Sequence, residues 1–193
     1  MNKLVVVGTS TGGLNALQML LPALQQEFSC AVVVVQHRGK EPGSQLRDFL
    51  QRSSPLPVKE PEDKEPILGG QVYLAPRDYH LLVERGNFAL STEAPVYFAR
   101  PSIDVLFESA ADAYGETVVG VILTGANGDG ARGLAKIKSA GGTAIVQEPA
   151  SAQASAMPEA AIAATNIDRI LPLKEIGIFL SDVCHQRPRG ELK

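Results

Sequence analysis

The stretch LVVVGTSTGG, residues 4–13, predicts a buried β-strand that ends in a glycine-rich turn. The apolar run from Leu4 to Val7 suits a strand covered on both faces. After the turn, four leucines recur at helical spacing (Leu14, Leu17, Leu21 and Leu24), and a second apolar run follows from Ala31 to Val35. This order predicts a βαβ unit, in which the two strands are parallel and the crossover is right-handed.

The rest of the chain repeats the alternation of strand and helix. We expect further strands at Val118–Leu123 and Thr143–Val146, and helices that begin at Ser102, run over Ala131–Ala140 and Ala156–Ala164, and end with Lys174–Val183. The pattern predicts a doubly wound α/β fold, with a mainly parallel sheet and helices on both faces.

The middle of the chain departs from this pattern. The proline-rich segment Ser53–Gly70 predicts a surface loop with at most a short strand near Val58. Short strands are expected at Val72–Leu74, His80–Val83 and Phe88–Ser91, and the turn residues Glu84 to Asn87 join the last two. A small antiparallel excursion is therefore predicted. We expect one catalytic domain over residues 1–184 and a polar tail over 185–193.

Composition excludes several classes of protein. The 193 residues carry 18 Lys and Arg against 21 Asp and Glu, a formal charge of -3, which argues against nucleic-acid binding. The apolar runs are far shorter than a bilayer span, and the first residues lack the plan of a signal peptide, so we expect a cytoplasmic protein without membrane insertion. One domain suits this length.

Cysteine and histidine usage predicts neither a disulfide nor a metal site. The two cysteines, Cys30 and Cys184, do not form a C-x-x-C pair, and we expect both to be buried free thiols. The three histidines, His37, His80 and His185, show no spacing that places two of them on one helical face.

Three polar residues follow predicted parallel strands at their carboxyl ends, where such folds place their sites. Ser10 follows the first strand, His37 follows Ala31–Val35, and Asp129 lies in the loop after Val118–Leu123. A serine, a histidine and an aspartate gathered there suggest a catalytic triad. The turn also matches the G-x-S-x-G pattern of a nucleophile elbow, in which the Thr11 N–H would stabilise an oxyanion.

Each of these residues also has a plainer interpretation. A glycine-rich turn before a helix can bind phosphate, His37 can be an ordinary histidine at a strand end, and Asp129 can cap the helix that begins at Ala131. We expect His80 and His185 to be structural or solvent-exposed. A nucleotide-binding domain is the weaker alternative, because Ser10 occupies the second glycine position of G-x-G-x-x-G and the P-loop lysine is missing.

Five ordered blocks carry a resemblance to a known family: VGTSTGG (7–13), VQH (35–37), IDVLF (103–107), LTGANGDGA (123–131) and AGG (140–142). The chain resembles the catalytic domain of the chemotaxis receptor protein-glutamate methylesterases, the CheB family, from about Lys3 to Leu173. The order Ser10, His37, Asp129 also separates it from the α/β-hydrolases, in which the aspartate precedes the histidine.

The resemblance implies a bacterial serine hydrolase that removes methyl esters from glutamate side chains on chemoreceptor cytoplasmic helices and releases methanol. It implies no cofactor, and many relatives also deamidate glutamines. Carried over by position, Ser10 is the nucleophile, His37 the general base and Asp129 the group that orients it. The backbone N–H of Ala126 is the second oxyanion donor.

The chain departs from the family pattern in three ways, one of which is that Ala126 replaces the usual Met before the loop glycine. Members usually carry a receiver domain before the catalytic domain, whereas the first strand here begins at Leu4, which suggests a stand-alone esterase or an excised domain. A stand-alone enzyme could be controlled by a separate response regulator acting in trans. The usual Met-Pro-Pro after His37 is replaced by Arg38-Gly39-Lys40, which changes the substrate groove. A catalytically idle module that docks receptors or signalling partners is the alternative function.

Overall fold

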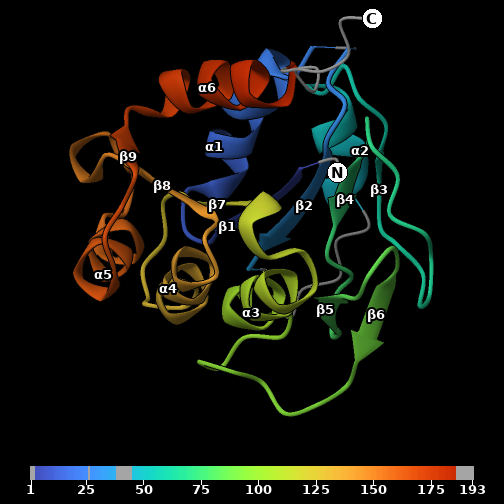
Figure 1. Cartoon of the computed structure of the whole chain (residues 1–193). Helices are drawn as coiled ribbons and strands as arrows, with labels where there is room; N and C mark the ends of the chain where they lie inside the picture. Colours follow the sequence, from blue (N-terminus) through green and yellow to red (C-terminus); the bar gives the residue numbers. More distant parts are fainter. Residues whose placement is uncertain (1–2, 26, 38–44, 186–193) are drawn as a thin grey trace, which may run out of the picture.

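A computed structural model describes residues 3–25, 27–37 and 45–185 of the chain. Within these residues, seven parallel strands form one sheet in the order β3-β4-β2-β1-β7-β8-β9 (Figure 1). Its strands are β1 (Leu4–Thr9), β2 (Ala31–Gln36), β3 (Val58–Lys59), β4 (Val72–Leu74), β7 (Val118–Ile122), β8 (Thr143–Gln147) and β9 (Arg169–Leu171). A separate antiparallel pair consists of β5 (His80–Val83) and β6 (Phe88–Ser91). The predicted fold class is confirmed.

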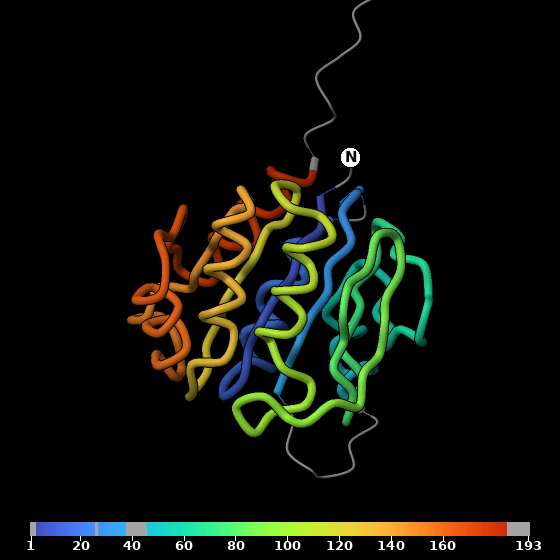
Figure 2. The backbone as a smooth tube through the Cα atoms, turned by 60° about the horizontal axis from the view of Figure 1, so that its bottom comes forward, coloured from blue at the N-terminus to red at the C-terminus, as the bar shows by residue number. Residues whose placement is uncertain are grey.

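Helices cover both faces of the sheet. One face carries α1 (Gly13–Leu20), α2 (Gln45–Gln51) and α6 (Leu173–His185), and the other carries α3 (Ile103–Tyr114), α4 (Ala131–Ser139) and α5 (Ala156–Ala164), which lie side by side (Figures 1 and 2). The described ranges also contain three short 3-10 helices, η1 (Leu21–Ala23), η2 (Gly115–Thr117) and η3 (Pro149–Ser151). None of the helices in the described ranges is long and apolar enough to cross a membrane.

The central strand β1 explains the two-layer core. Its side chains alternate, so that Val5 and Val7 pack with the helices of one face while Leu4 and Val6 pack with those of the other. All four are essentially inaccessible to solvent. Such double burial is typical of a parallel sheet and accounts for the uninterrupted apolar run in the sequence.

The elements differ from the sequence predictions at a few places. The buried residues of α1 are Gly13, Ala16, Leu17 and Leu20. Leu14, which the helical spacing grouped with Leu17, is instead exposed. The helix ends at Leu20, and the chain continues as η1 with Pro22, which cannot donate a helical hydrogen bond. Two elements were not predicted, α2 and the edge strand β9, which are too short to show a clear hydrophobic period.

One residue of the predicted C-terminal tail lies in a helix. His185 is the last residue of α6, so it belongs to the helix and not to the tail. The remaining tail residues, 186–193, lie outside the described residues, as does the segment Arg38-Gly39-Lys40.

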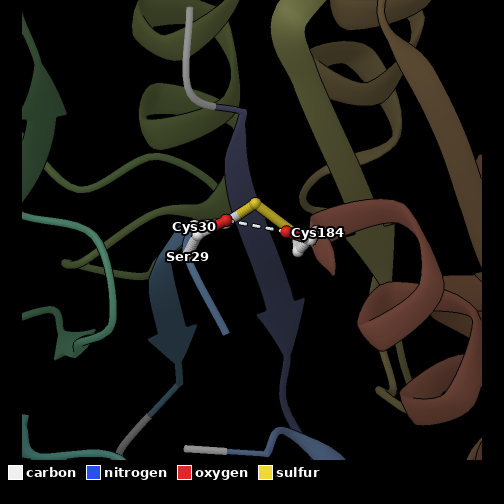
Figure 3. The surroundings of a disulfide bond; sticks show 3 residues. All are labelled: Ser29, Cys30 and Cys184. Atoms are coloured by element: carbon white, nitrogen blue, oxygen red, sulfur yellow. Dashed lines mark hydrogen bonds between the residues drawn. A yellow bond between two sulfur atoms is a disulfide. The ribbon is translucent and has the colours of Figure 1, made fainter. Parts of the chain in front are cut away.

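The expectation of two free thiols is wrong. Cys30 and Cys184 form a disulfide bond between the start of β2 and the end of α6, with their Cα atoms 5.8 Å apart (Figure 3). Both cysteines are buried, as predicted, and the Ser29 Oγ donates to the Cys184 carbonyl at 2.7 Å. Sequence could not show the pairing because 154 positions separate the two cysteines.

Candidate active site

Ser10 lies in the turn between β1 and α1. Its N–H donates to the Thr124 carbonyl at 3.0 Å, and its own carbonyl accepts from the Gly13 N–H at 2.9 Å. Gly12 has a φ of 80°, the left-handed conformation that favours glycine. The turn therefore holds Ser10 at the carboxyl end of β1, where the residue is partly exposed.

His37 directly follows β2, the neighbour of β1. The strand register pairs Thr9 with Gln36, and the His37 N–H donates to the Thr9 carbonyl at 3.0 Å. The Gln36 side chain ties the two strand ends together, since its Nε2 donates to the carbonyls of Ser10 (2.9 Å) and His37 (2.8 Å). Ser10 and His37 thus each directly follow one member of the paired residues Thr9 and Gln36, at the ends of two neighbouring parallel strands.

Asp129 pairs with His37 across the loop after β7. The Asp129 Oδ2 lies 2.7 Å from the His37 Nε2, and the side chains are 0% and 10% exposed, respectively. Asp129 also accepts from the N–H groups of Ile103 (2.7 Å) and Asp104 (3.0 Å) and from the Ser102 hydroxyl (2.9 Å). The carboxylate therefore caps α3, and not the helix at Ala131 that the sequence suggested.

The pKa of Asp129 is lowered despite its burial. Burial alone raises the pKa, but the hydrogen bond from His37 and those from the Asp104 and Ile103 N–H groups favour the charged form and outweigh it. Asp129 is therefore an ionised partner for the imidazole. With Nε2 engaged by Asp129, Nδ1 is the ring nitrogen left to exchange a proton with another group.

Thr124 joins the turn after β1 to the loop after β7. Its buried hydroxyl donates to the Thr11 carbonyl at 2.8 Å and accepts from the Ala154 N–H at 2.9 Å. Within the part of the chain that the structure describes, the N–H groups of Thr11 and Ala126 have no acceptor, and both residues are exposed. Two unpartnered N–H groups on loops that Thr124 ties together are suited to stabilise a developing oxyanion.

A pocket of about 610 Å³ opens beside His37. It is lined by His37 and Asn127 from the site, by Arg77 and Asp78 after β4, and by residues 95 and 97–101 between β6 and α3. The site thus has room for a substrate segment next to the His37 imidazole.

Comparison with known proteins identifies the family of this chain. The family model described as CheB methylesterase matches residues 5–180. The crystal structure of the Thermotoga maritima CheB methylesterase catalytic domain superposes with a TM-score of 0.90 and 36% identity, over 95% of this chain and 99% of that one. The chain belongs to the CheB methylesterase family.

Relatives within the CheB family differ in length. A Leptospira interrogans protein named "Putative protein-glutamate methylesterase/protein-glutamine glutaminase" is 47% identical over 173 residues, which cover 89% of this chain and 90% of that protein. A Cupriavidus metallidurans protein-glutamate methylesterase/protein-glutamine glutaminase 1 is 43% identical over 181 residues, but these cover only 50% of its length.

The other two histidines of this CheB family member were expected to be structural or solvent-exposed. His80 is buried, its Nδ1 accepts from the Ser102 N–H at 3.2 Å, and its Nε2 donates to the Ala94 carbonyl at 3.1 Å. Both ring nitrogens are thereby used, so the structural role expected for His80 fits its contacts. His185 ends α6.

Several residues that shape the site were missed from sequence. Gln36, Thr124 and Asp104 are all buried and polar. The Gln36 and Thr124 side chains donate to backbone carbonyls of the turn after β1, and the Asp104 N–H donates to the Asp129 carboxylate. Gln147 likewise accepts from the Thr124 N–H at 3.0 Å. The available signal was position, because Gln36, Thr124 and Gln147 each end or follow an apolar parallel strand, the edge at which sites form.

Proposed function

We propose that this CheB family member is a serine hydrolase that removes methyl esters from glutamate side chains, with Ser10 as nucleophile, His37 as general base and Asp129 as the orienting carboxylate. The main support for this proposal is the 2.7 Å contact between the His37 Nε2 and the fully buried Asp129 carboxylate. His37 lies at the end of the strand next to the one that Ser10 follows. An ionised, immobilised carboxylate of this kind selects the tautomer with the proton on Nε2.

The chemistry then follows in two halves. His37 Nδ1 takes the Ser10 hydroxyl proton as Oγ attacks the ester carbonyl, and the N–H groups of Thr11 and Ala126 stabilise the oxyanion. The intermediate collapses, the C–OCH₃ bond breaks, and His37 returns the proton to release methanol. Water then attacks the glutamyl ester of Ser10 by the same route, restoring the serine and leaving a glutamate carboxylate.

The electrostatics of the site support this sequence of steps. His37 becomes positively charged each time it holds the proton, and the negative Asp129 at 2.7 Å stabilises that charge. General acid-base catalysis of this kind is worth about 10² to 10⁴-fold in rate. The same acyl-enzyme chemistry also hydrolyses a glutamine amide with ammonia as the leaving group, in line with the glutaminase activity that the relatives' names include.

The substrate proteins we propose are methylated chemoreceptor cytoplasmic domains, with a separate response regulator as an activator in trans. This assignment implies a cytoplasmic location. The Cys30–Cys184 disulfide is the feature that conflicts with it, because cytosolic thiols are normally kept reduced. Thiol labelling of the protein quenched directly from cells tests the location: labelled cysteines agree with a reducing compartment.

The deciding experiment is methanol release from methyl-esterified receptor cytoplasmic fragments by wild type and by Ser10→Ala. We expect release by wild type alone, with circular dichroism showing that both proteins fold. Equal release by Ser10→Ala would overturn Ser10 as the nucleophile. A folded wild type that binds the fragments yet releases no methanol, with and without phosphorylated response regulator, would favour a docking module.

A further inference from the structure

The segment between β6 and α3, whose path Figure 2 shows, contains a tight turn. Residues of this segment line the pocket beside His37. Val96 and Ala99 exchange two backbone hydrogen bonds, of 3.0 Å and 2.8 Å, around the two residues Tyr97 and Phe98. Both central residues have positive φ, 48° and 61°, which defines a type I′ turn. Asparagine and glycine normally fill these positions, because larger side chains are strained there.

The two aromatic side chains are unusually exposed. Tyr97 is 55% exposed and Phe98 is 104% exposed, so neither contributes a buried core contact that would offset the strained backbone. In the described part of the chain four residues other than glycine have positive φ, and three of them, Asp78, Tyr97 and Phe98, line the pocket beside His37. Strained residues gathered at one pocket point to a binding role.

The pocket also has a preferred charge. Its lining carries two guanidinium groups, Arg77 and Arg100, and one carboxylate, Asp78, whose Oδ2 lies 3.7 Å from the Arg77 Nε. The lining thus has one positive charge in excess, although the chain as a whole has a net charge of -3. Arg100 supports the base of the turn, because its Nη1 donates to the carbonyls of Thr92 (2.8 Å) and Glu93 (3.0 Å). An occupant that is acidic and also has apolar side chains fits this surface best.

We propose that the Tyr97–Phe98 turn is a docking element that packs against the acidic protein segment around the glutamyl ester. The inference rests on the proposed function, since the pocket is continuous with His37 and the ester must reach that residue. The aromatic pair supplies contact area at low entropic cost, and the excess positive charge of the lining favours neighbouring carboxylates. The turn therefore governs the choice of protein substrate.

The test replaces the pair by the sequence that the turn prefers, Tyr97→Asn with Phe98→Gly. Steady-state rates of methanol release are measured on a methyl-esterified receptor fragment and on N-acetylglutamate γ-methyl ester. We expect the ratio of kcat/KM on the protein to that on the small ester to fall about tenfold, through KM, which is typical of losing an aromatic anchor. The thermal midpoint of unfolding should not fall, because asparagine and glycine suit positive φ.

The control is Ile178→Ala on the outer surface of α6, where the side chain is 59% exposed. It should leave the ratio unchanged. An unchanged ratio in the turn variant, or an equal loss on both substrates, would overturn the docking role while leaving the esterase intact. A wild type that releases no methanol from either substrate would overturn the proposed function, and this inference with it.

Discussion

Asp129 caps α3, the helix on which Asp104 lies, and Asp104 caps α4, the helix that Asp129 precedes. Asp129 precedes α4, yet its carboxylate accepts from the N–H groups of Ile103 and Asp104 at the start of α3. Asp104 lies in the first turn of α3, and its Oδ1 accepts from the N–H groups of Gly130 (3.0 Å) and Gly133 (2.7 Å) at the start of α4. Each carboxylate also meets the positive end of the other helix dipole. The exchange locks α3 and α4 together and fixes the carboxylate that faces His37.

Asp129→Asn tests the orientation of His37. An amide can present an NH₂ group to the His37 Nε2, which reverses the required tautomer and removes the charge that stabilises the imidazolium. We expect kcat for methanol release to fall by about 10² to 10⁴-fold. The change also weakens hydrogen bonds to Ile103 and Ser102, so urea unfolding should show a loss of about 1–3 kcal/mol. A folded variant with the kcat of wild type would contradict the assigned role.

Asp104→Asn tests the buried carboxylate pair through pH. Burial, and then the charge of Asp129, raise the pKa of Asp104 against the opposing hydrogen bond from Gly133. Because the pKa of Asp104 is raised in the folded state, the protonated side chain favours the folded protein. This contribution to the free energy of unfolding is fully present below the unfolded pKa of about 3.9 and is lost as the pH rises through the folded pKa. Asparagine keeps an oxygen for Gly130 and Gly133 but cannot ionise.

The free energy of unfolding of Asp104→Asn, relative to wild type, should therefore increase as the pH rises from about 4 to 7. Urea titrations at pH steps across this range measure it. The matched control is Asp112→Asn, which removes an exposed carboxylate from the same helix. A relative stability that stays flat or decreases with rising pH would show that Asp104 does not ionise with a raised pKa.

Thr124→Val tests the link between the two oxyanion loops. Valine keeps the shape of threonine but removes the hydroxyl that donates to the Thr11 carbonyl and accepts from the Ala154 N–H, leaving those two backbone groups without this partner. We expect a stability loss of about 1–3 kcal/mol and a fall in kcat larger than any change in KM. Thr117→Val, which removes a hydroxyl bound only to the Tyr114 carbonyl, is the control and should retain kcat. A variant that loses stability but keeps kcat would assign Thr124 a purely structural role.

Reduction of the disulfide tests its contribution to stability. The bond closes a loop of 154 positions, so Cys30→Ser or added reductant should lower the free energy of unfolding by about 2–5 kcal/mol. Methanol release should persist, because the bond lies at the start of β2 and His37 follows its end, about 20 Å away at about 3.3 Å for each of six residues. Reductant should not affect Cys30→Ser further. Loss of activity on reduction, with the fold retained, would contradict this separation.

Much of the fold and the candidate site could be predicted because their signals are local. The apolar run of β1, the glycine turn after it and the helical spacing of α3 each lie within a short window. Parallel strands then bring their carboxyl ends to one edge, which is why Ser10, His37 and Asp129 could be proposed together before any contact was known. Short elements without a period, α2 and β9, escaped this reasoning.

Sequence by itself determined the α/β class, the parallel pairing and the three polar residues at neighbouring strand ends. Only the tertiary structure decided which helix Asp129 caps, that Cys30 meets Cys184, and that Tyr97 and Phe98 stand exposed on a strained turn beside His37. The physical reason is that periodicity and turn chemistry act between residues close in the chain. Hydrogen bonds, disulfides and pocket walls depend instead on how segments far apart in sequence pack in space.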